Sequence, residues 1–267
     1  MAALTEEQSM IQDQAKSWVT EQSSVQKFRE MRDSGIETKF MPETWQEIVK
    51  MGWTGIIVPE QYGGSGLGYL TFGVVLEELG RQLTASPLFA SCLVGASSIL
   101  LGGSEEQKQR VLPKVVDGST ILTLAIDEGP RHSPANTSLV AKKIDGGFRL
   151  SGNKTFVHEG MAATDFLVVA RTSGSGEKGI TLFLVSANAD GVSRESVATV
   201  DSRGYGNVHF DGVSVSESQM LGDLDQGFFL LESILDRARA GLSAEMLGTA
   251  AQAFDMPLDY LKTREQF

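Results

Sequence analysis

Cysteine is almost absent from this 267-residue chain, and the single residue, Cys92, cannot form an internal disulfide. One thiol is consistent with a reducing compartment, because disulfide-stabilised secreted domains carry several cysteines. Positive charge is also scarce, since 23 Lys and Arg stand against 34 Asp and Glu and give a formal net charge of −11. An acidic surface disfavours nonspecific nucleic-acid binding, because it repels phosphates.

The chain shows neither a basic leader nor a long apolar run. Its first residues, MAALTEEQSM, lack the features of a signal peptide. The most apolar stretch, residues 87–101, contains small residues and is shorter than the ~20 residues that a membrane-spanning helix needs. We therefore expect a cytoplasmic protein without stable membrane insertion and without nucleic-acid partners.

Motifs for metal binding and for nucleophilic catalysis are lacking as well. His132, His158 and His209 show no metal-ligand spacing, so no metal site is predicted. No local motif supports Ser-His-Asp catalysis. The glycine-rich segment 62–68 lacks the lysine of a phosphate-binding P-loop, and we interpret it as a turn between helices.

Hydrophobic periodicity divides the chain into three zones, and the hydrophobic share of 41% is enough for one or two cores. The first zone, residues 1–118, has a helical period. Thr5 with Gln8 and Ser104 with Gln107 predict capping boxes at the starts of two of its helices. Further helices are predicted over residues 42–51, 70–82 and 87–101.

The second zone, residues 119–222, has a period of two, and the third, residues 223–267, is helical again. Asp145-Gly146 predicts a tight hairpin turn within the β zone, because this pair accepts positive φ angles. Strands are predicted over residues 121–126, 140–143, 148–151, 166–170, 180–185 and 208–215. In the third zone one long helix and the start of another are expected, with a break near Pro257.

The predicted fold class is therefore α+β and multidomain. An N-terminal all-α domain (1–118) precedes a middle β-barrel or sandwich domain (119–222), and the first part of a C-terminal helical bundle follows (223–267). The apolar face of the last helical segment needs a partner, either further chain or another subunit.

Several motifs, in order and spacing, resemble the acyl-CoA dehydrogenase family of flavoproteins over essentially all of the chain. They lie at residues 52–66, 103–114, 150–154, 221–222, 235–239 and 263–267. The resemblance implies FAD as cofactor, acyl-CoA as substrate and assembly as a homo- or hetero-oligomer, usually a dimer or tetramer. It also implies electron-transferring flavoprotein as the usual electron acceptor.

The family reaction is the α,β-desaturation of an acyl thioester. A base removes the proton α to the carbonyl, and N5 of the flavin accepts a hydride from the β carbon. The flavin carries the redox chemistry, while the protein supplies binding, orientation and electrostatics. The base should be a carboxylate whose pKa is raised by an apolar pocket.

The resemblance implies a first group of flavin contacts at the end of the first β-zone strand. The family has a Thr-Glu-Pro stretch here; Glu128 is retained, but Asp127 replaces Thr and Gly129 replaces Pro. In the following loop, residues 130–134, Ser133 is the best match for the family's CoA-contacting serine. The flavin-lining residues implied by this segment are Leu124, Ala125, Ile126 and Asp127.

A second group of flavin contacts is implied after Gly152-Asn153-Lys154, where the family usually has Trp-Ile-Thr or Trp-Ile-Ser. Here the residues are Phe156, Val157 and His158. Phe156 can pack against the flavin ring. His158 takes the place of a hydroxyl that bonds near N5, and an imidazole can donate such a bond. The alternative interpretation of His158 is a partly exposed loop histidine.

Residues of the last zone match further family positions. Arg264 matches an arginine that reaches the FAD pyrophosphate of a neighbouring subunit, a task suited to guanidinium; alternatively it is an exposed helix-end arginine. Phe267 matches a flavin-contacting phenylalanine. Arg239 matches an arginine at the acyl-CoA pocket, with Asp236 one turn earlier; alternatively these two form an exposed i,i+3 pair.

No catalytic base can be assigned. In most relatives the catalytic glutamate lies on a loop beyond the position of residue 267. In a minority it lies on the first long C-terminal helix, where this chain has Ala238. Neither Glu232 nor Asp236 falls at the family position.

Three functional hypotheses follow. The first is an FAD-dependent acyl-CoA dehydrogenase. The second is a non-catalytic or partial subunit that supports a hetero-oligomeric acyl-CoA dehydrogenase, motivated by the altered loops and the missing glutamate. The third is a relative that uses flavin for oxidation or oxygenation of another substrate.

Overall fold

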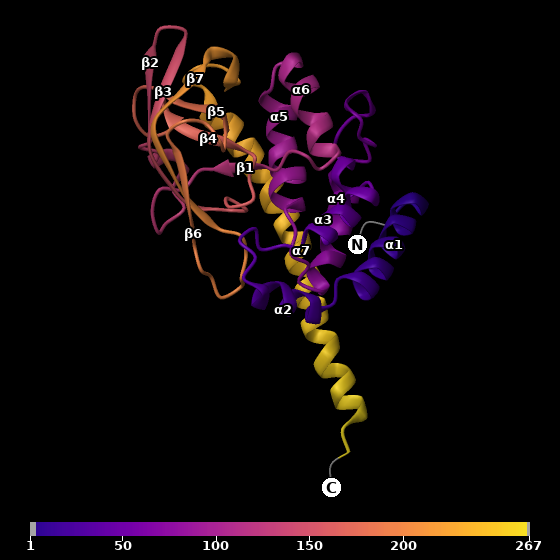
Figure 1. Ribbon diagram of the computed structural model, residues 1–267. Coiled ribbons are helices and arrows are strands. Elements are labelled where there is room, and N and C mark those ends of the chain that lie inside the picture. The colour runs from indigo at the N-terminus through magenta and orange to yellow at the C-terminus, as the bar shows by residue number, and fades with distance from the viewer. Residues whose placement is uncertain (1–3, 266–267) are drawn as a thin grey trace.

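Helices, strands and a final long helix follow one another in the predicted order in a computed structural model, which describes residues 4–265 (Figure 1). In Figure 1 the β region and the N-terminal helices stand side by side, and the last helix runs between and beyond them. The N-terminal region contains α1 (Glu6–Gln22), α2 (Val25–Ser34), α3 (Pro42–Lys50), α4 (Gly68–Arg81), a π-helical segment (Leu88–Gly95), α5 (Ala96–Gly102) and α6 (Glu105–Val116).

The capping residues define the helix ends as predicted. Both capping boxes form, with the side chains of Thr5 and Ser104 accepting hydrogen bonds from the backbone N–H groups of Gln8 and Gln107. Gln107 also donates from Nε2 to the carbonyls of Ser218 and Met220, each at 2.9 Å, which ties α6 to the β region. The sequence interpretation missed α2, whose mixed polar sequence shows little apolar periodicity.

The helix expected over residues 87–101 is wrong in its first half, which is π-helical. This segment lies directly on the first strand: Oγ of Ser91 accepts from N–H of Leu122 at 3.1 Å and donates to the carbonyl of Thr120 at 3.3 Å. A side chain at Gly95 would collide with the backbone of Leu122. Close backbone approach therefore shapes this segment more than helical periodicity does.

The β region consists of one eight-stranded sheet with the order β6-β7-β3-β2-β4-β5-β8, and β1 pairs in parallel with β4. Asp145-Gly146 forms the predicted turn between β2 and β3, with Gly146 at φ +73°. The strands are β1 (Leu122–Ala125), β2 (Val140–Ile144), β3 (Gly147–Val157), β4 (Asp165–Arg171), β5 (Ile180–Ser186), β6 (Val192–Ser196), β7 (Gly206–Ser216) and β8 (Met220–Leu221). β6 was not predicted, because its sequence is mostly polar.

Two hydrophobic cores share strand β4, whose side chains alternate between them. Phe166 and Val168 point into a core inside the β region, while Leu167 and Val169 pack into the core of the helical region. Alternate side chains of a strand face opposite sides of the sheet, so a strand covered on both faces is apolar at every position. β4 thus joins the sheet to the helices.

The last helix, α7 (Gly227–Thr263), packs along α4 at two close approaches. Gly248 lies against the carbonyl of Glu77, and Gly80 lies against the carbonyl of Glu245, where any Cβ would overlap the oxygen. These contacts fix α7 beside the helical core, and they place Glu245 near the β region.

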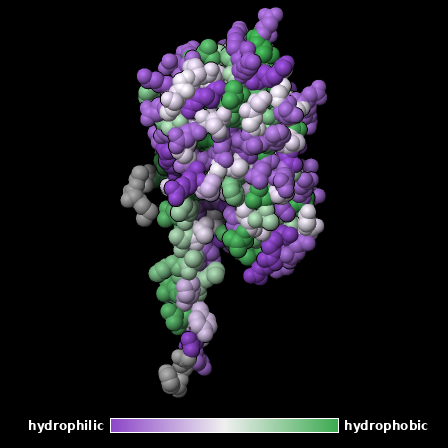
Figure 2. Space-filling view, turned by 90° about the vertical axis from the view of Figure 1, so that its left-hand side faces the viewer, coloured by the Kyte–Doolittle hydropathy of each residue, from purple (hydrophilic) through white to green (hydrophobic). Residues whose placement is uncertain are grey.

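The expected break near Pro257 is wrong, since α7 continues through it to Thr263. The residues around Pro257 are exposed, so water can satisfy the carbonyl that a proline leaves without its helical partner. The projecting end is largely green in the space-filling view, with purple residues toward its tip (Figure 2). Its exposed apolar side chains are Phe254, Met256, Leu258, Tyr260 and Leu261.

Candidate functional site

The ends of β1 and β3, which carry the two predicted flavin segments, lie side by side. Oγ1 of Thr123 donates to the carbonyl of His158 at 2.5 Å. The N–H of Thr155 donates to the carbonyl of Asp127 at 2.7 Å. Segments about 30 residues apart in the chain are thereby held together.

Lys154 and Glu128 hold this junction from the buried side. Nζ of Lys154, fully buried, lies 2.7 Å from Oε1 of Glu128 and donates to the carbonyl of Ile126 at 3.0 Å. Burial lowers the pKa of Lys154 to about 8, against the opposing effect of Glu128. Burial raises the pKa of Glu128, but Lys154 and bonds from Ser138 and Leu139 outweigh this, and the net pKa is lowered.

Three of the predicted flavin-lining residues bury their side chains in a core. Ala125 and Val157 belong to the β core, and Leu124 belongs to the helical core. These three can offer only main-chain groups to a ligand. Ile126 and Asp127 are half-buried and lie at the surface of the junction.

Phe156 and His158 stand out from this junction as an aromatic pair linked by Tyr205. Phe156 is 50% exposed and adopts φ +49°, a conformation that bulky residues rarely take. The Phe156 and Tyr205 rings lie 6.3 Å apart, and the His158 ring stacks on Tyr205 at 5.3 Å. On another side, Phe89 lies 5.6 Å from His158. His158 lies in the turn after β3 with its side chain 22% exposed, as the alternative of a partly exposed loop histidine describes, so its predicted flavin contact stays a prediction.

A buried polar cluster adjoins His158, and no sequence motif predicted it. Glu159 is 3% exposed and adopts φ +55°, a second left-handed residue within four positions. Arg203 pairs with Glu245 of α7. Burial raises the pKa of Glu159 to about 8, and burial followed by the charge of Arg203 lowers the pKa of His158 to about 3. Glu159, Arg203 and Glu245 meet only through the fold, because each comes from a different segment.

The loop after β1 makes local contacts of its own. Nδ1 of His132 lies 2.9 Å from Oδ1 of Asp127, so the residue that replaces the family's threonine is paired within the loop. Oγ of Ser133 accepts from Nδ2 of Asn136 at 2.6 Å. Ser133 itself remains exposed at the surface, so the predicted CoA contact stays a prediction.

The predicted residues of α7 lie apart from the β1–β3 junction. Arg239 is half exposed and pairs with Asp236 at 2.8 Å and with Glu232 at 3.4 Å, as the i,i+3 alternative describes. The guanidinium of Arg264 lies 5.6 Å from the ring centroid of Tyr260 on the projecting end. Ala238 packs against the helical core.

Phe267 lies outside the described residues, so its predicted flavin contact stays a prediction. Glu245 follows Ala238 by seven residues, about two helical turns, and therefore shares its face of α7. The Arg203–Glu245 pair thus lies in line with the position where a minority of relatives carry their base.

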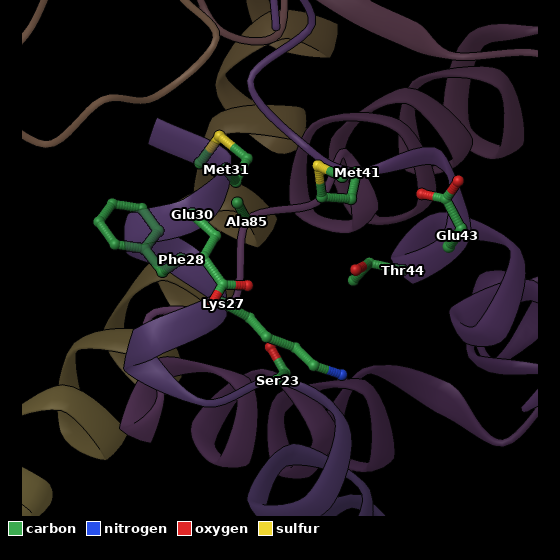
Figure 3. Close-up of a pocket in the computed structure, with 9 residues that line it drawn as sticks. All are labelled: Ser23, Lys27, Phe28, Glu30, Met31, Met41, Glu43, Thr44 and Ala85. Atoms are coloured by element: carbon green, nitrogen blue, oxygen red, sulfur yellow. The ribbon is translucent and has the colours of Figure 1, made fainter. Parts of the chain in front are cut away.

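Cavities lie beside the helices in several places. A groove of about 740 Å³ runs between α4 and α7, lined mostly by apolar residues together with Gln12, Glu77, Asp236 and Arg237. A smaller cavity of about 240 Å³ lies between α2 and α3, with Met31 and Met41 at one end and Ser23 and Lys27 at the other (Figure 3). The smaller cavity contains none of the predicted site residues.

Comparison with known proteins agrees with this arrangement of regions. Residues 5–119 match the N-terminal domain of acyl-CoA dehydrogenase, and residues 127–213 match its middle domain. The solved structure titled "Tcur3481-Tcur3483 steroid ACAD G363A variant" is 35% identical, with a TM-score of 0.86 over 98% of this chain and 68% of that chain. The chain belongs to the acyl-CoA dehydrogenase family. The resemblance drawn from the sequence motifs and the predicted fold class are both confirmed.

Two further relatives show how much of an acyl-CoA dehydrogenase the chain represents. Mitochondrial isovaleryl-CoA dehydrogenase of Solanum tuberosum is 32% identical over 86% of this chain, which spans 58% of that protein. Butyryl-CoA dehydrogenase from Megasphaera elsdenii is 27% identical, with a TM-score of 0.90 over 100% of this chain and 72% of that chain. The chain therefore spans a little over half to about seven-tenths of these relatives.

Members of the acyl-CoA dehydrogenase family are FAD-dependent flavoprotein oxidoreductases, so the expected cofactor class is confirmed at the level of the family. Within residues 4–265, no group of three or more His, Cys, Asp or Glu side chains is placed to hold a metal ion. None of the helices in the same range combines the length and apolar character needed to cross a bilayer.

Proposed function

We propose that this protein binds FAD at the β1–β3 junction and takes part in the α,β-desaturation of an acyl-CoA thioester. The observation that carries the proposal is the hydrogen-bonded union of the two flavin segments, Thr123 to His158 and Thr155 to Asp127. Family membership alone would not require these altered segments to meet.

The residues at the junction fit a flavin ring. Phe156 offers a half-exposed aromatic face, and its backbone is held in a left-handed conformation by a bond from its N–H to Oδ1 of Asn207 at 3.3 Å. Main-chain groups at Leu124, Ala125 and Val157 line the same surface, and His158 supplies a ring nitrogen. Proteins often hold residues in strained conformations at ligand sites, because the strain presets the side chain.

The desaturation removes a proton from the α carbon and a hydride from the β carbon, leaving an enoyl thioester. When bound, FAD supplies the hydride acceptor, and a carboxylate must accept the proton. Ala238 cannot accept it, so the proton acceptor is a carboxylate other than the one found in relatives with a helix-borne base. Lys154 and Glu128 hold the backbone at Ile126, which keeps the junction rigid while the substrate is bound.

The substrate and assembly residues complete the proposal. Ser133 would contact CoA, and Asp236 with Arg239 would line the mouth of the acyl pocket. Arg264, on the projecting end of α7, would reach the FAD pyrophosphate of a neighbouring subunit in a dimer or tetramer, with Phe267 beside the same flavin. Electron-transferring flavoprotein would accept the electrons.

The test is reconstitution of the purified chain with FAD, followed by anaerobic addition of isovaleryl-CoA or butyryl-CoA. We expect a yellow protein whose flavin absorbance falls when the matching thioester is added. Phe156→Ala should weaken FAD binding about tenfold, whereas Phe254→Ala, which removes an exposed phenylalanine from α7, should leave it unchanged. A chain that takes up no FAD at micromolar concentration would refute the proposal.

The oligomeric state is measured in the same preparation by native mass spectrometry. A homodimer or homotetramer is expected, and this result would exclude a supporting subunit of a hetero-oligomer. Flavin that is bound but unchanged by acyl-CoA, together with co-purification of a second dehydrogenase subunit, would instead replace the catalytic proposal with the supporting one. Peroxide formation without an added acceptor would indicate an oxidase.

A further inference from the structure

Two polar atoms beside the proposed flavin surface are buried without a hydrogen-bond partner in the described part of the chain. They are Nε2 of His158 and Oε2 of Glu159. Oε1 of the same carboxyl group lies 3.5 Å from Nε2, so a small rotation of the carboxyl brings the two groups to normal hydrogen-bond distance. Buried polar atoms are nearly always paired, so these adjacent atoms should pair with each other.

One shared proton is needed for this pair, because a carboxylate and an unprotonated imidazole nitrogen are both acceptors. The proton can lie on the carboxyl group, which leaves both groups neutral. It can lie on Nε2 with the carboxylate ionised, which buries a net negative charge. A doubly protonated imidazole beside a carboxylate would bury an ion pair.

Burial of Glu159 favours the neutral arrangement, and its effect is larger than that of the nearby charges. The charge of Arg203 favours an ionised Glu159, but Arg203 is paired with Glu245 and does not offset the burial of Glu159. The charges of Glu245 and Asp201 oppose ionisation of Glu159. The charge of Arg203 opposes protonation of His158, while that of Asp201 favours it. Tyr205, from the same loop as Arg203, stacks on the imidazole and adds no charge while its pKa is raised by burial.

We propose that Glu159 is a positioning residue whose neutral carboxyl group donates a hydrogen bond to Nε2 of His158. A neutral imidazole that accepts at one nitrogen carries its proton on the other. His158 is therefore held as the Nδ1–H tautomer, with its ring fixed between Phe89 and Tyr205.

This tautomer matters for the flavin site, and that part of the inference rests on the proposed function. The His158 side chain is 22% exposed, and its buried nitrogen is Nε2, so Nδ1 is the nitrogen available to a ligand. Nδ1–H would offer a flavin one uncharged hydrogen-bond donor. The Nε2–H tautomer would offer an acceptor at the same point instead.

The experiment uses two-bond ¹⁵N–¹H correlation spectra of the full chain, labelled with ¹⁵N-histidine and without added FAD. The chain contains three histidines, so His132→Gln and His209→Gln assign the remaining signals to His158 by subtraction. At pH 6.5 we expect the Nδ1–H pattern for His158. An Nε2–H pattern or a doubly protonated ring at that pH would overturn the assignment.

Variants of Glu159 separate a donated proton from simple packing. Glu159→Gln retains an N–H donor of the same shape, so it should keep the Nδ1–H pattern at every pH. In the wild type the pattern should change to Nε2–H as the pH passes about 8, where Glu159 loses its proton. A wild type that keeps one pattern from pH 6.5 to 9, or a Gln variant that changes as the wild type does, would contradict the inference.

The tautomer is measured without flavin, so its failure is distinct from that of the proposed function. Addition of FAD supplies the second readout: the Nδ1 resonance of His158 should shift, while those of His209, on the exposed face of β7, should stay in place. FAD that binds and leaves the His158 signals unmoved would overturn the role of this nitrogen toward the flavin.

Discussion

Replacing Glu159 by glutamine should remove a pH dependence of stability from the wild-type protein. The side chain is 3% exposed, and the charge of Arg203, which pairs with Glu245, does not offset this burial. Burial raises the pKa of Glu159 from its ordinary value near 4.5 to about 8. The folded state therefore keeps a proton that the unfolded state has lost, and this proton must dissociate at alkaline pH.

The sign of the effect follows from proton binding. Between the unfolded and folded pKa values the folded state binds more protons, so its stability falls as the pH rises. From pH 6.5 to 8.5 this loss is roughly 2 kcal/mol, because each tenfold change in proton affinity is worth about 1.4 kcal/mol. The pH range starts at 6.5 to keep His158 out of the measurement. The pKa of His158 is lowered from 6.5 to about 3, so its own contribution to stability is lost as the pH falls below 6.5.

The assay is urea unfolding of the wild type and of Glu159→Gln at pH 6.5 and 8.5. The wild type should lose about 2 kcal/mol more than the variant across this interval. Effects of other groups, including Lys154 with its pKa near 8, cancel in the comparison. Glu37→Gln removes the same charge from an exposed site and should behave as the wild type does. Equal losses in wild type and Glu159→Gln would refute the reasoning, because Glu159 would then be ionised throughout.

Gly248→Ala should destabilise the protein by about 3 kcal/mol, because the new Cβ overlaps the carbonyl oxygen of Glu77 in α4. Gly73→Ala lies at the same interface, but its Cβ meets only the Ala244 side chain, at 3.6 Å. This variant should be neutral or slightly stabilising in thermal unfolding. A destabilised Gly73→Ala would contradict this packing. Lys154→Met should cost about 3 kcal/mol, because it leaves Glu128 partly buried without its cation, and it should weaken FAD binding. Lys142→Met, at an exposed lysine of β2, should change neither denaturation midpoint nor FAD affinity.

Local sequence signals were accurate where short-range chemistry decides the structure. The capping residues Thr5 and Ser104 start their helices as predicted, and Asp145-Gly146 forms its hairpin. Such features depend on hydrogen bonds and φ angles within a few residues. The capping boxes and the hairpin turn can therefore be predicted without knowledge of the rest of the fold.

Periodicity failed where contacts between distant segments or solvent override local preference. The π-helical segment at Leu88–Gly95 lies on the backbone of β1, and no sequence pattern within residues 87–101 predicts that contact. Pro257 did not end α7, because exposure lets water bond the freed carbonyl. β6 was missed because pairing with β7, rather than apolar alternation, makes its polar sequence a strand.

The candidate site likewise contains residues that local motifs predicted and residues that only the fold identified. Motif positions were sufficient to single out Phe156 and His158, since the family pattern is local to the segment after Lys154. They said nothing of Glu159, which is adjacent in sequence but is buried only in the folded chain, near the charges of Arg203 and Glu245. The sequence alone therefore does not distinguish an exposed glutamate from a buried one.

The sequence by itself determined the order of the three regions, the family to which the chain belongs and the segments that should meet a flavin, because these follow from periodicity and short motifs. Only the tertiary structure decided that β1 and β3 join through Thr123 and Thr155, and that the side chains of Ala125 and Val157 face a core. It also brought together His158 and Glu159 with the Arg203–Glu245 pair. The physical reason is desolvation, since the charge of a carboxyl group depends on which distant residues exclude water from it.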